Sequence, residues 1–187
     1  MEESARPEAG RSEKNSAANL YDWIESLVTA VVACILIFLF LFRVVNVDGT
    51  SMVPTLEDSD KIVISRLAGN YEYGDIVVLT KTAYSDESIV KRVIATGGQT
   101  IDIDFERGVV YVDGKALDEP YIAEKTSRSL DFSGPVTVPE GCVFCMGDNR
   151  NRSTDSRRSV IGMIDKRCIL GKVVLRLWPV TKLGTVR

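Results

Sequence analysis

The stretch Val109-Val110-Tyr111-Val112-Asp113-Gly114-Lys115-Ala116-Leu117 is the clearest local indication of the fold. An Asp-Gly pair between two strand-forming runs is typical of a two-residue hairpin turn, because both turn residues need a positive φ. Outward from this hairpin the chain keeps the same character, with short β-branched runs that end at Gly, Pro, Asp or Asn. The sequence therefore predicts a mostly β domain after Val47.

Further strand candidates are spread over the rest of the chain. They are residues 61–65, 76–80, 89–95, 100–105, 109–112, 136–138, 142–146 and 172–178. Turns at Gly74-Asp75, Gly97-Gly98 and Pro139-Glu140-Gly141 separate several of them, and residues 118–134 form a looser excursion. Short strands without a long helix between them favour a folded or closed β architecture over a βαβ sheet.

A long apolar run precedes the β region. From Leu27 to Phe42 every residue except Thr29 is apolar, and valines extend the run beyond Arg43. About 20 such residues cross a bilayer as a helix. A soluble core helix would not be apolar all round, and a cleavable signal sequence would be followed by a small-x-small site. The sequence predicts an uncleaved, single-pass transmembrane anchor at residues 20–46.

The chain divides into three predicted segments. Residues 1–19 are polar and mixed in charge, which is typical of a disordered tail, and residues 47–187 form one domain behind the anchor. The Lys and Arg residues on the two sides of the anchor slightly favour a cytoplasmic tail, which makes the β domain extracytoplasmic. With 23 basic and 26 acidic residues, the net charge of −3 does not indicate a nucleic-acid partner.

The four cysteines do not indicate a metal site. Cys34 lies in the apolar run, Cys142 and Cys145 form a C-x-x-C pair, and Cys168 stands alone. Zinc would need a fourth ligand, and the chain has no histidine to supply one. Strand residues three apart face opposite sides, so the C-x-x-C pair would bridge poorly. We predict small buried hydrophobic cysteines, no metal and no cofactor.

The absence of histidine also limits serine chemistry. Ser51 follows the anchor, in Ser51-Met52-Val53-Pro54-Thr55, and a Ser-His-Asp site is excluded. Lys91 lies in the otherwise apolar stretch 88–95, where burial would lower its pKa from about 10.4 and make it a usable base. Taken singly, Ser51 also fits a polar turn and Lys91 a solvated strand face.

A dense polar loop follows the predicted strand 142–146. Within residues 147–158, Ser153 could orient a lysine amine, and Asp155 could pair with Arg157 beneath it. A solvated loop or an anion-binding loop is the alternative. Functional loops on a rigid β scaffold are common.

Together, these segments resemble bacterial type I signal peptidases. The resemblance rests on residues 51–56, 73–78, 90–94 and 147–157, in this order behind an apolar run. It implies a mostly β domain of coiled antiparallel sheets and a membrane-bound serine endopeptidase. Such an enzyme removes signal peptides from exported preproteins after small-x-small sites, on the outer face of the cytoplasmic membrane. Its partners would be these preproteins and the lipid bilayer.

The resemblance also implies roles for individual residues. Ser51 would be the nucleophile and Lys91 its general base. The supporting residues would be Ser153, which would hydrogen-bond the amine, Asp155 paired with Arg157, and Gly147 and Asp148, which would shape the strand end. The residues expected to line shallow substrate pockets are Val47, Leu56, Ile89 and Val90.

The chain departs from the family pattern at two places. Gly49 stands where some members have a serine that helps bind the oxyanion, so the oxyanion hole would rely more on backbone N–H groups. Gly97-Gly98-Gln99 replaces the usual Pro-Gly-Asp. Two alternatives stay open: a tethered peptidase that cleaves a partner or itself, and an anchored, non-catalytic β domain that binds exported proteins.

Overall fold

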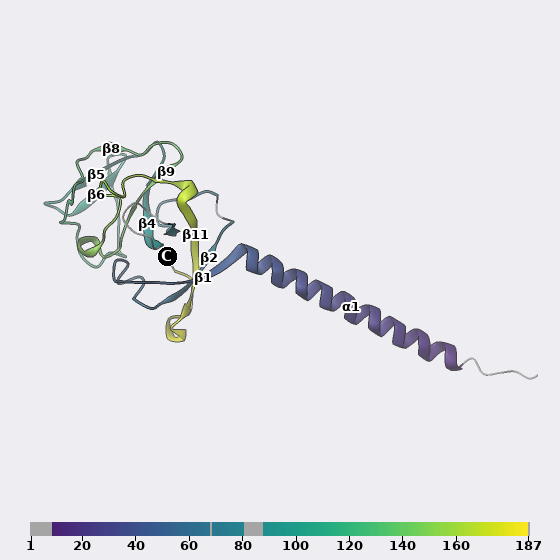
Figure 1. Cartoon of the computed structure of the whole chain (residues 1–187). Helices are drawn as coiled ribbons and strands as arrows, with labels where there is room; N and C mark the ends of the chain where they lie inside the picture. Colours follow the sequence, from purple (N-terminus) through teal and green to yellow (C-terminus); the bar gives the residue numbers. More distant parts are fainter. Residues whose placement is uncertain (1–8, 68, 81–87, 187) are drawn as a thin grey trace, which may run out of the picture. The chain divides into compact units, whose positions relative to one another are not determined.

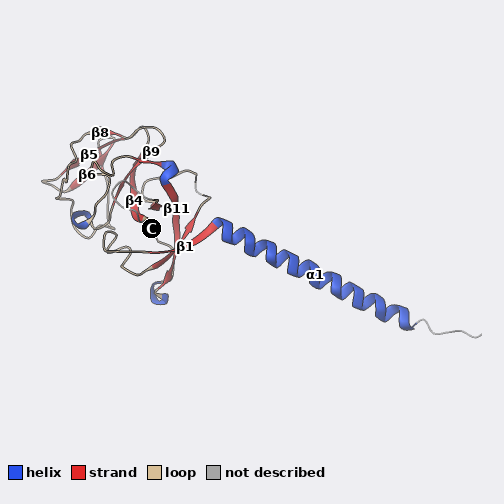
Figure 2. Ribbon diagram, viewed as in Figure 1, coloured by secondary structure: helices blue, strands red, loops and turns tan. Residues whose placement is uncertain are grey.

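The structure is a computed structural model that describes residues 9–67, 69–80 and 88–186, with side chains described from residue 19 onward. The chain separates into two units between Leu41 and Phe42. The first unit contains one long helix and the second contains the strands (Figures 1 and 2).

The helix α1 (Ala9–Leu41) contains the predicted membrane span. Its part Asn19–Leu41 has 23 residues with a mean hydropathy of 2.7, and none of it is buried. Such a helix is about 35 Å long, against a hydrocarbon core of about 30 Å. Residues 9–19, predicted as disordered, are helical here. The stretch contains Ala, Glu, Lys and Arg, which readily extend a helix that is already formed.

The strand β1 (Phe42–Asn46) occupies the end of the segment that we predicted as anchor. It pairs antiparallel with β2 (Lys61–Ser65) along its whole length. An apolar residue that faces lipid and an apolar residue in a strand look the same in sequence. The hydrogen bonds to β2, which lies farther along the chain, decide between the two.

The strands form two antiparallel sheets, and the predicted mostly β class is confirmed (Figure 2). The larger sheet has the order β1-β2-β11-β3-β4-β9-β10, with β3 at Ile76–Leu79, β4 at Ile89–Thr96, β9 at Cys142–Met146, β10 at Ile164–Asp165 and β11 at Ile169–Trp178. The smaller sheet has the order β7-β6-β5-β8, with β5 at Thr100–Asp104, β6 at Val109–Val112, β7 at Lys115–Ala116 and β8 at Val136–Thr137. Short 3₁₀ helices lie at Arg150–Arg152 (η1), Lys166–Cys168 (η2) and Val180–Lys182 (η3).

The predicted hairpin is present between β6 and β7. Val112 pairs with Lys115, so Asp113 and Gly114 make a two-residue turn. Their φ angles are 52° and 74°, the positive values that this turn type needs. All the predicted strands are found, with some ends shifted, whereas the two-residue β10 carries too little pattern to be predicted.

The core lies on both faces of the larger sheet. In β3, Ile76 and Val78 pack into one apolar cluster, while Val77 and Leu79 pack into another on the opposite face. A third cluster joins residues of the larger sheet, such as Phe144, to residues of the smaller one. This double burial explains the uninterrupted apolar sequence of β3 and makes the centre of the sheet a rigid support.

We predict that Gly171→Ala destabilises the fold. A Cβ at position 171 would lie 2.7 Å from the Ser65 carbonyl oxygen of the neighbouring strand, and backbone cannot move aside easily. Such crowding costs about 1–3 kcal/mol. Chemical denaturation should show this loss, with Gly69→Ala as the control, because nothing lies within 4 Å of a Cβ there. Equal stability of the two variants would contradict the prediction.

Candidate active site

Ser51 lies in a loop between β1 and β2 that is closed by hydrogen bonds at its base. The Val47 N–H donates to the Asp60 carbonyl at 2.8 Å. Above this base, the Leu56 N–H donates to the Met52 carbonyl at 2.9 Å, and both side chains are buried in the core. These apolar side chains fasten the loop to the sheet and leave Ser51 half-buried at its surface.

Lys91 comes from the middle of β4, opposite Val77 of β3. The residue is 3% exposed. Its Nζ donates hydrogen bonds to Ser51 Oγ at 2.8 Å and to the Val90 carbonyl at 2.8 Å. The structure therefore brings the predicted nucleophile and base within hydrogen-bond reach, although they lie 40 positions apart in sequence.

Burial controls the protonation of this amine. It lowers the pKa of Lys91 to about 8, because the charged form is poorly solvated inside the sheet. Negative charge on Asp155 and Asp148 acts in the opposite direction and is the weaker influence. Burial also raises the pKa of the neighbouring Cys145 thiol, which therefore stays uncharged at neutral pH. An amine of this kind can be neutral at mildly alkaline pH and can accept a hydroxyl proton.

Ser153 lies close to the site but does not form the expected bond. We predicted that its hydroxyl bonds the lysine amine, whereas Ser153 Oγ is buried without a hydrogen-bond partner in the described residues. Its side chain packs against Gly147 instead. A Cβ at position 147 would overlap Ser153 Oγ and would lie 2.5 Å from the Ser51 carbonyl oxygen. The missing side chain of Gly147 thus lets two segments of the site approach each other.

Asp155 and Arg157 form an ion pair behind the site. Two guanidinium nitrogens donate to the two carboxylate oxygens, each at 2.8 Å, and neither side chain is exposed. Arg157 also donates to the Arg128 and Arg150 carbonyls, and Asp155 accepts the Gly147 N–H at 3.1 Å. Burial of both charges is tolerated because their other polar atoms are also bonded.

Asp148 pairs with Arg92, a residue that the sequence did not single out. Arg92 donates to both carboxylate oxygens, at 2.8 and 2.6 Å, and the Thr55 hydroxyl donates to the same carboxylate. The guanidinium also stacks on Tyr121, 3.9 Å from the ring centroid. Because neighbouring strand residues face opposite sides, β4 presents Lys91 to one side and Arg92 to the other. The sequence did contain a signal for this ion pair, because an arginine within an otherwise apolar strand is expected to be buried and paired.

Asn149 is a second residue that the sequence left out. Its backbone N–H donates to the Ser51 carbonyl at 3.0 Å, and its side-chain Nδ2 donates to the Thr50 carbonyl at 3.0 Å. Nothing in the sequence beyond its place in the polar loop signals these contacts.

The residues predicted to line substrate pockets are mostly interior. Val47, Leu56 and Val90 are at most 7% exposed and belong to one core cluster with Met52. Ile89 is half-buried and packs against the cluster on the opposite face of the sheet. The structure thus brings Val47, Leu56 and Val90 together in the core beneath the Ser51 loop, and they do not line an open pocket. We call these three packed residues the apolar floor.

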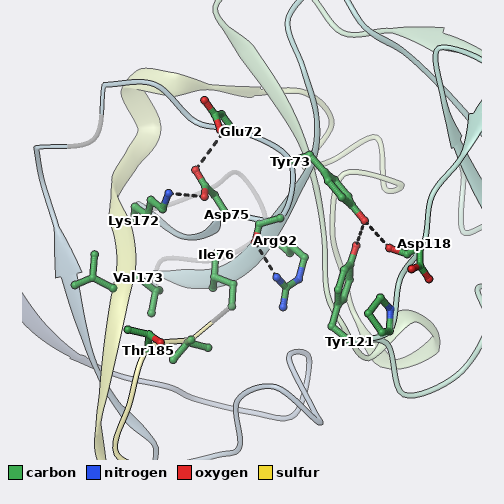
Figure 3. Close-up of a pocket in the computed structure, with 14 residues that line it drawn as sticks. Glu72, Tyr73, Asp75, Ile76, Arg92, Asp118, Tyr121, Lys172, Val173 and Thr185 are labelled. Carbon is green, nitrogen blue, oxygen red and sulfur yellow. Dashed lines mark hydrogen bonds and ion pairs between the residues drawn. The ribbon is translucent and has the colours of Figure 1, made fainter.

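A cavity of about 800 Å³ opens beside Tyr73 and Tyr121, whose hydroxyls lie 3.1 Å apart (Figure 3). On its other side Lys172 Nζ pairs with Asp75 at 2.5 Å (Figure 3). Neither the serine nor the buried lysine of the candidate site lines this cavity.

The cysteines follow the prediction only in part. Cys145 is buried, Cys142 is half-buried, and both are free. Cys168 is exposed, so the prediction of a buried residue is wrong for it, whereas Cys34 lies in the apolar segment of α1 that we predict to span the membrane. Cys168 closes the surface turn η2, which carries no core side chain. Among the residues that the structure describes, no group of three or more His, Cys, Asp or Glu residues could hold a metal ion.

A serine hydroxyl 2.8 Å from a buried lysine amine, in a chain without histidine, has the geometry of the Ser-Lys class of hydrolase sites. The family model for signal peptidase, peptidase S26, matches residues 20–178. The chain therefore belongs to the signal peptidase family, peptidase S26, and is a hydrolase of that family.

Individual relatives cover most of the chain. Signal peptidase I of Bacillus licheniformis is 39% identical over 178 residues, which span 88% of this chain and 90% of that protein. Signal peptidase I S of Bacillus subtilis strain 168 is 36% identical and spans 86% and 90%. A crystal structure of a signal peptidase I from Enterococcus faecalis V583 is 27% identical, with a TM-score of 0.47, over 55% of this chain and 96% of that one.

We predict that Gly147→Ala strongly lowers activity. The new methyl group would meet both the Ser153 side chain and the Ser51 backbone, so the serine would shift away from the lysine. A displacement of about 1 Å can cost about 100-fold in rate. Turnover of a preprotein by the purified full chain would measure the loss, with Gly69→Ala as the control in open space. Full activity of Gly147→Ala would show that this close approach is not needed.

Proposed function

We propose that this chain is a membrane-anchored signal peptidase I in which Ser51 is the nucleophile and Lys91 the general base. Its family membership already makes it a hydrolase that processes signal peptides. The observation that carries the finer assignment is the 2.8 Å contact between Ser51 Oγ and the buried Lys91 amine. No histidine in the chain competes for the role of base.

The chemistry follows from the neutral amine. Lys91 accepts the hydroxyl proton as Ser51 Oγ bonds to the scissile carbonyl carbon, and the charged amine then gives that proton to the leaving amino group. Water subsequently attacks the acyl-enzyme, with the same amine as base, and frees Ser51. In both steps negative charge develops on the carbonyl oxygen, and the Ser51 N–H would donate a hydrogen bond to that oxygen.

The apolar floor beside the serine supports cleavage after small-x-small sites. Val47, Leu56 and Val90 already fill the space there with each other and with Met52. A substrate side chain larger than alanine would have to displace a packed core, which typically costs about 1–3 kcal/mol. By excluding larger side chains in this way, Val47, Leu56 and Val90 would favour substrates with small residues at the cleavage site.

The anchor supports a site close to the membrane. In our proposal α1 crosses the bilayer, the segment before residue 20 is cytoplasmic, and the catalytic domain lies on the extracytoplasmic face. Ser51 follows the helix end at Leu41 by ten residues, 51 minus 41, so the extended chain keeps it within about 35 Å of that end. Signal peptides present their cleavage sites just beyond an apolar stretch, so substrate and nucleophile would meet at the membrane surface.

We predict that Ser51→Ala and Lys91→Met each abolish cleavage. The two changes remove the nucleophile and the base, and losses of about 1000-fold or more are typical for such residues. The assay is processing of a preprotein with an Ala-x-Ala site by the full chain in detergent. Lys172→Met is the matched control, because that lysine pairs with Asp75 away from Ser51. Substantial turnover by Lys91→Met at neutral pH would contradict the assignment.

We predict that kcat/KM rises with pH and levels off above a midpoint near the pKa of Lys91, about 8. Only the neutral amine can accept a proton, so protonation below this pKa removes the base. A flat profile between about pH 5 and 9 would argue against a lysine base.

The lowered pKa of Lys91 also predicts how the free energy of unfolding changes with pH. The unfolded chain keeps this proton up to a pKa of about 10.5, and the folded chain only up to about 8. Burial of Lys91 therefore lowers the free energy of unfolding at neutral pH, and this cost disappears as the pH rises through that window. Lys91→Met should be more stable than the wild type at pH 7, with a smaller difference at high pH.

A further inference from the structure

Asn149 contacts the backbone on both sides of the Thr50–Ser51 peptide bond. It is 8% exposed. Its backbone N–H donates to the Ser51 carbonyl at 3.0 Å, and its side-chain Nδ2 donates to the Thr50 carbonyl at 3.0 Å. The second bond depends on the side chain alone, so a substitution can remove it while the first remains.

The bond to the Thr50 carbonyl also helps to determine where the Ser51 N–H points. A trans peptide is planar, so the carbonyl oxygen of Thr50 and the N–H of Ser51 belong to one rigid unit and point in opposite directions. The Val53 N–H also donates to this oxygen, at 3.3 Å, so the Asn149 amide makes the shorter of the two bonds that hold the Thr50 oxygen and thereby orient the N–H. Within the described residues the Ser51 N–H donates to no protein group, so it is free to bond a substrate oxygen.

The surroundings of this peptide unit make such a restraint necessary. The preceding residue, Gly49, has a φ of +83° and no side chain that could supply a second donor. Its own N–H is occupied by Asp58 Oδ1 at 2.6 Å. The Ser51 N–H would thus carry much of the oxyanion stabilisation, beside a glycine whose backbone is intrinsically permissive.

Asn149 is well supported for this task. Its neighbour Asp148 is held by Arg92 through two bonds, at 2.8 and 2.6 Å, with both side chains buried. On its other side, the Arg152 N–H donates to the Asn149 carbonyl at 3.0 Å. The amide therefore projects from a rigid segment.

We propose that Asn149 is a positioning residue that directs the Ser51 N–H at the oxygen of the tetrahedral intermediate. The proposal rests on the proposed function, in which Ser51 is the nucleophile. Asn149 itself would touch neither the substrate nor the reacting hydroxyl.

The central test is Asn149→Ala in the full chain. We expect kcat to fall about 10- to 100-fold with little change in KM. The Ser51 N–H bonds the substrate oxygen most strongly in the transition state, where negative charge develops, so its misdirection affects the chemical step more than substrate binding. The pH midpoint should stay near that of the wild type, since the bond between Lys91 and Ser51 is intact. Asn149→Gln, which keeps an amide donor, should recover part of the lost kcat.

A transition-state probe separates positioning from a structural role. A peptide aldehyde with a C-terminal alanine forms a tetrahedral adduct with the serine, and its oxygen lies where the oxyanion forms. Its affinity for Asn149→Ala should fall by about the same factor as kcat/KM. Asn151→Ala is the matched control: its side chain bonds the backbone at Lys125, Ser127 and Arg128, and kcat should stay within about threefold.

The failing outcomes are distinct. Unchanged kcat in Asn149→Ala, or a lowered melting temperature as its only effect, would overturn the positioning role. Equal kcat losses in Asn149→Ala and Asn151→Ala would do the same, because they would reflect a loosened loop. Retained cleavage by Ser51→Ala would instead overturn the proposed function itself.

Discussion

The site depends on the burial of one lysine amine, because burial favours the neutral form of that amine. Lys91 lies on a central strand, between β3 and β9, and is 3% exposed. A charged amine is costly in such a place, so the environment that removes water also makes the neutral form accessible. The sheet supplies the burial on one side, and the loop that carries Ser51 supplies a single polar partner on the other.

The buried charges around the lysine are arranged to leave this balance intact. Three buried arginines each hold a carboxylate: Arg92 with Asp148, Arg150 with Glu119 and Arg157 with Asp155. Asp148 and Asp155 are therefore paired with guanidinium groups, and their tendency to raise the pKa of Lys91 is weaker than the lowering by burial. The same pairs rigidify the loop that carries Gly147 and Asn149, and that loop in turn holds the Ser51 backbone.

Particular elements show which parts of the fold can be predicted. The Asp113-Gly114 hairpin was predictable because a two-residue turn has a local chemical requirement. The segment 42–46 was not, because its apolar residues suit a membrane helix as well as a strand. Cys168 was placed wrongly for a similar reason, since a cysteine alone says little about burial.

The sequence by itself determined the class of fold, through turn chemistry and strand patterning, and it determined that no histidine could act as base. The tertiary structure decided the geometry of the site. Ser51 meets Lys91 across 40 positions and Thr50 meets Asn149 across 99, because the loops that carry Ser51 and Asn149 pack onto the paired strands. It also paired Arg92 with Asp148 and left Ser153 Oγ without the expected bond. Such contacts have no local signal, because they depend on which strands become neighbours and on how far each side chain reaches.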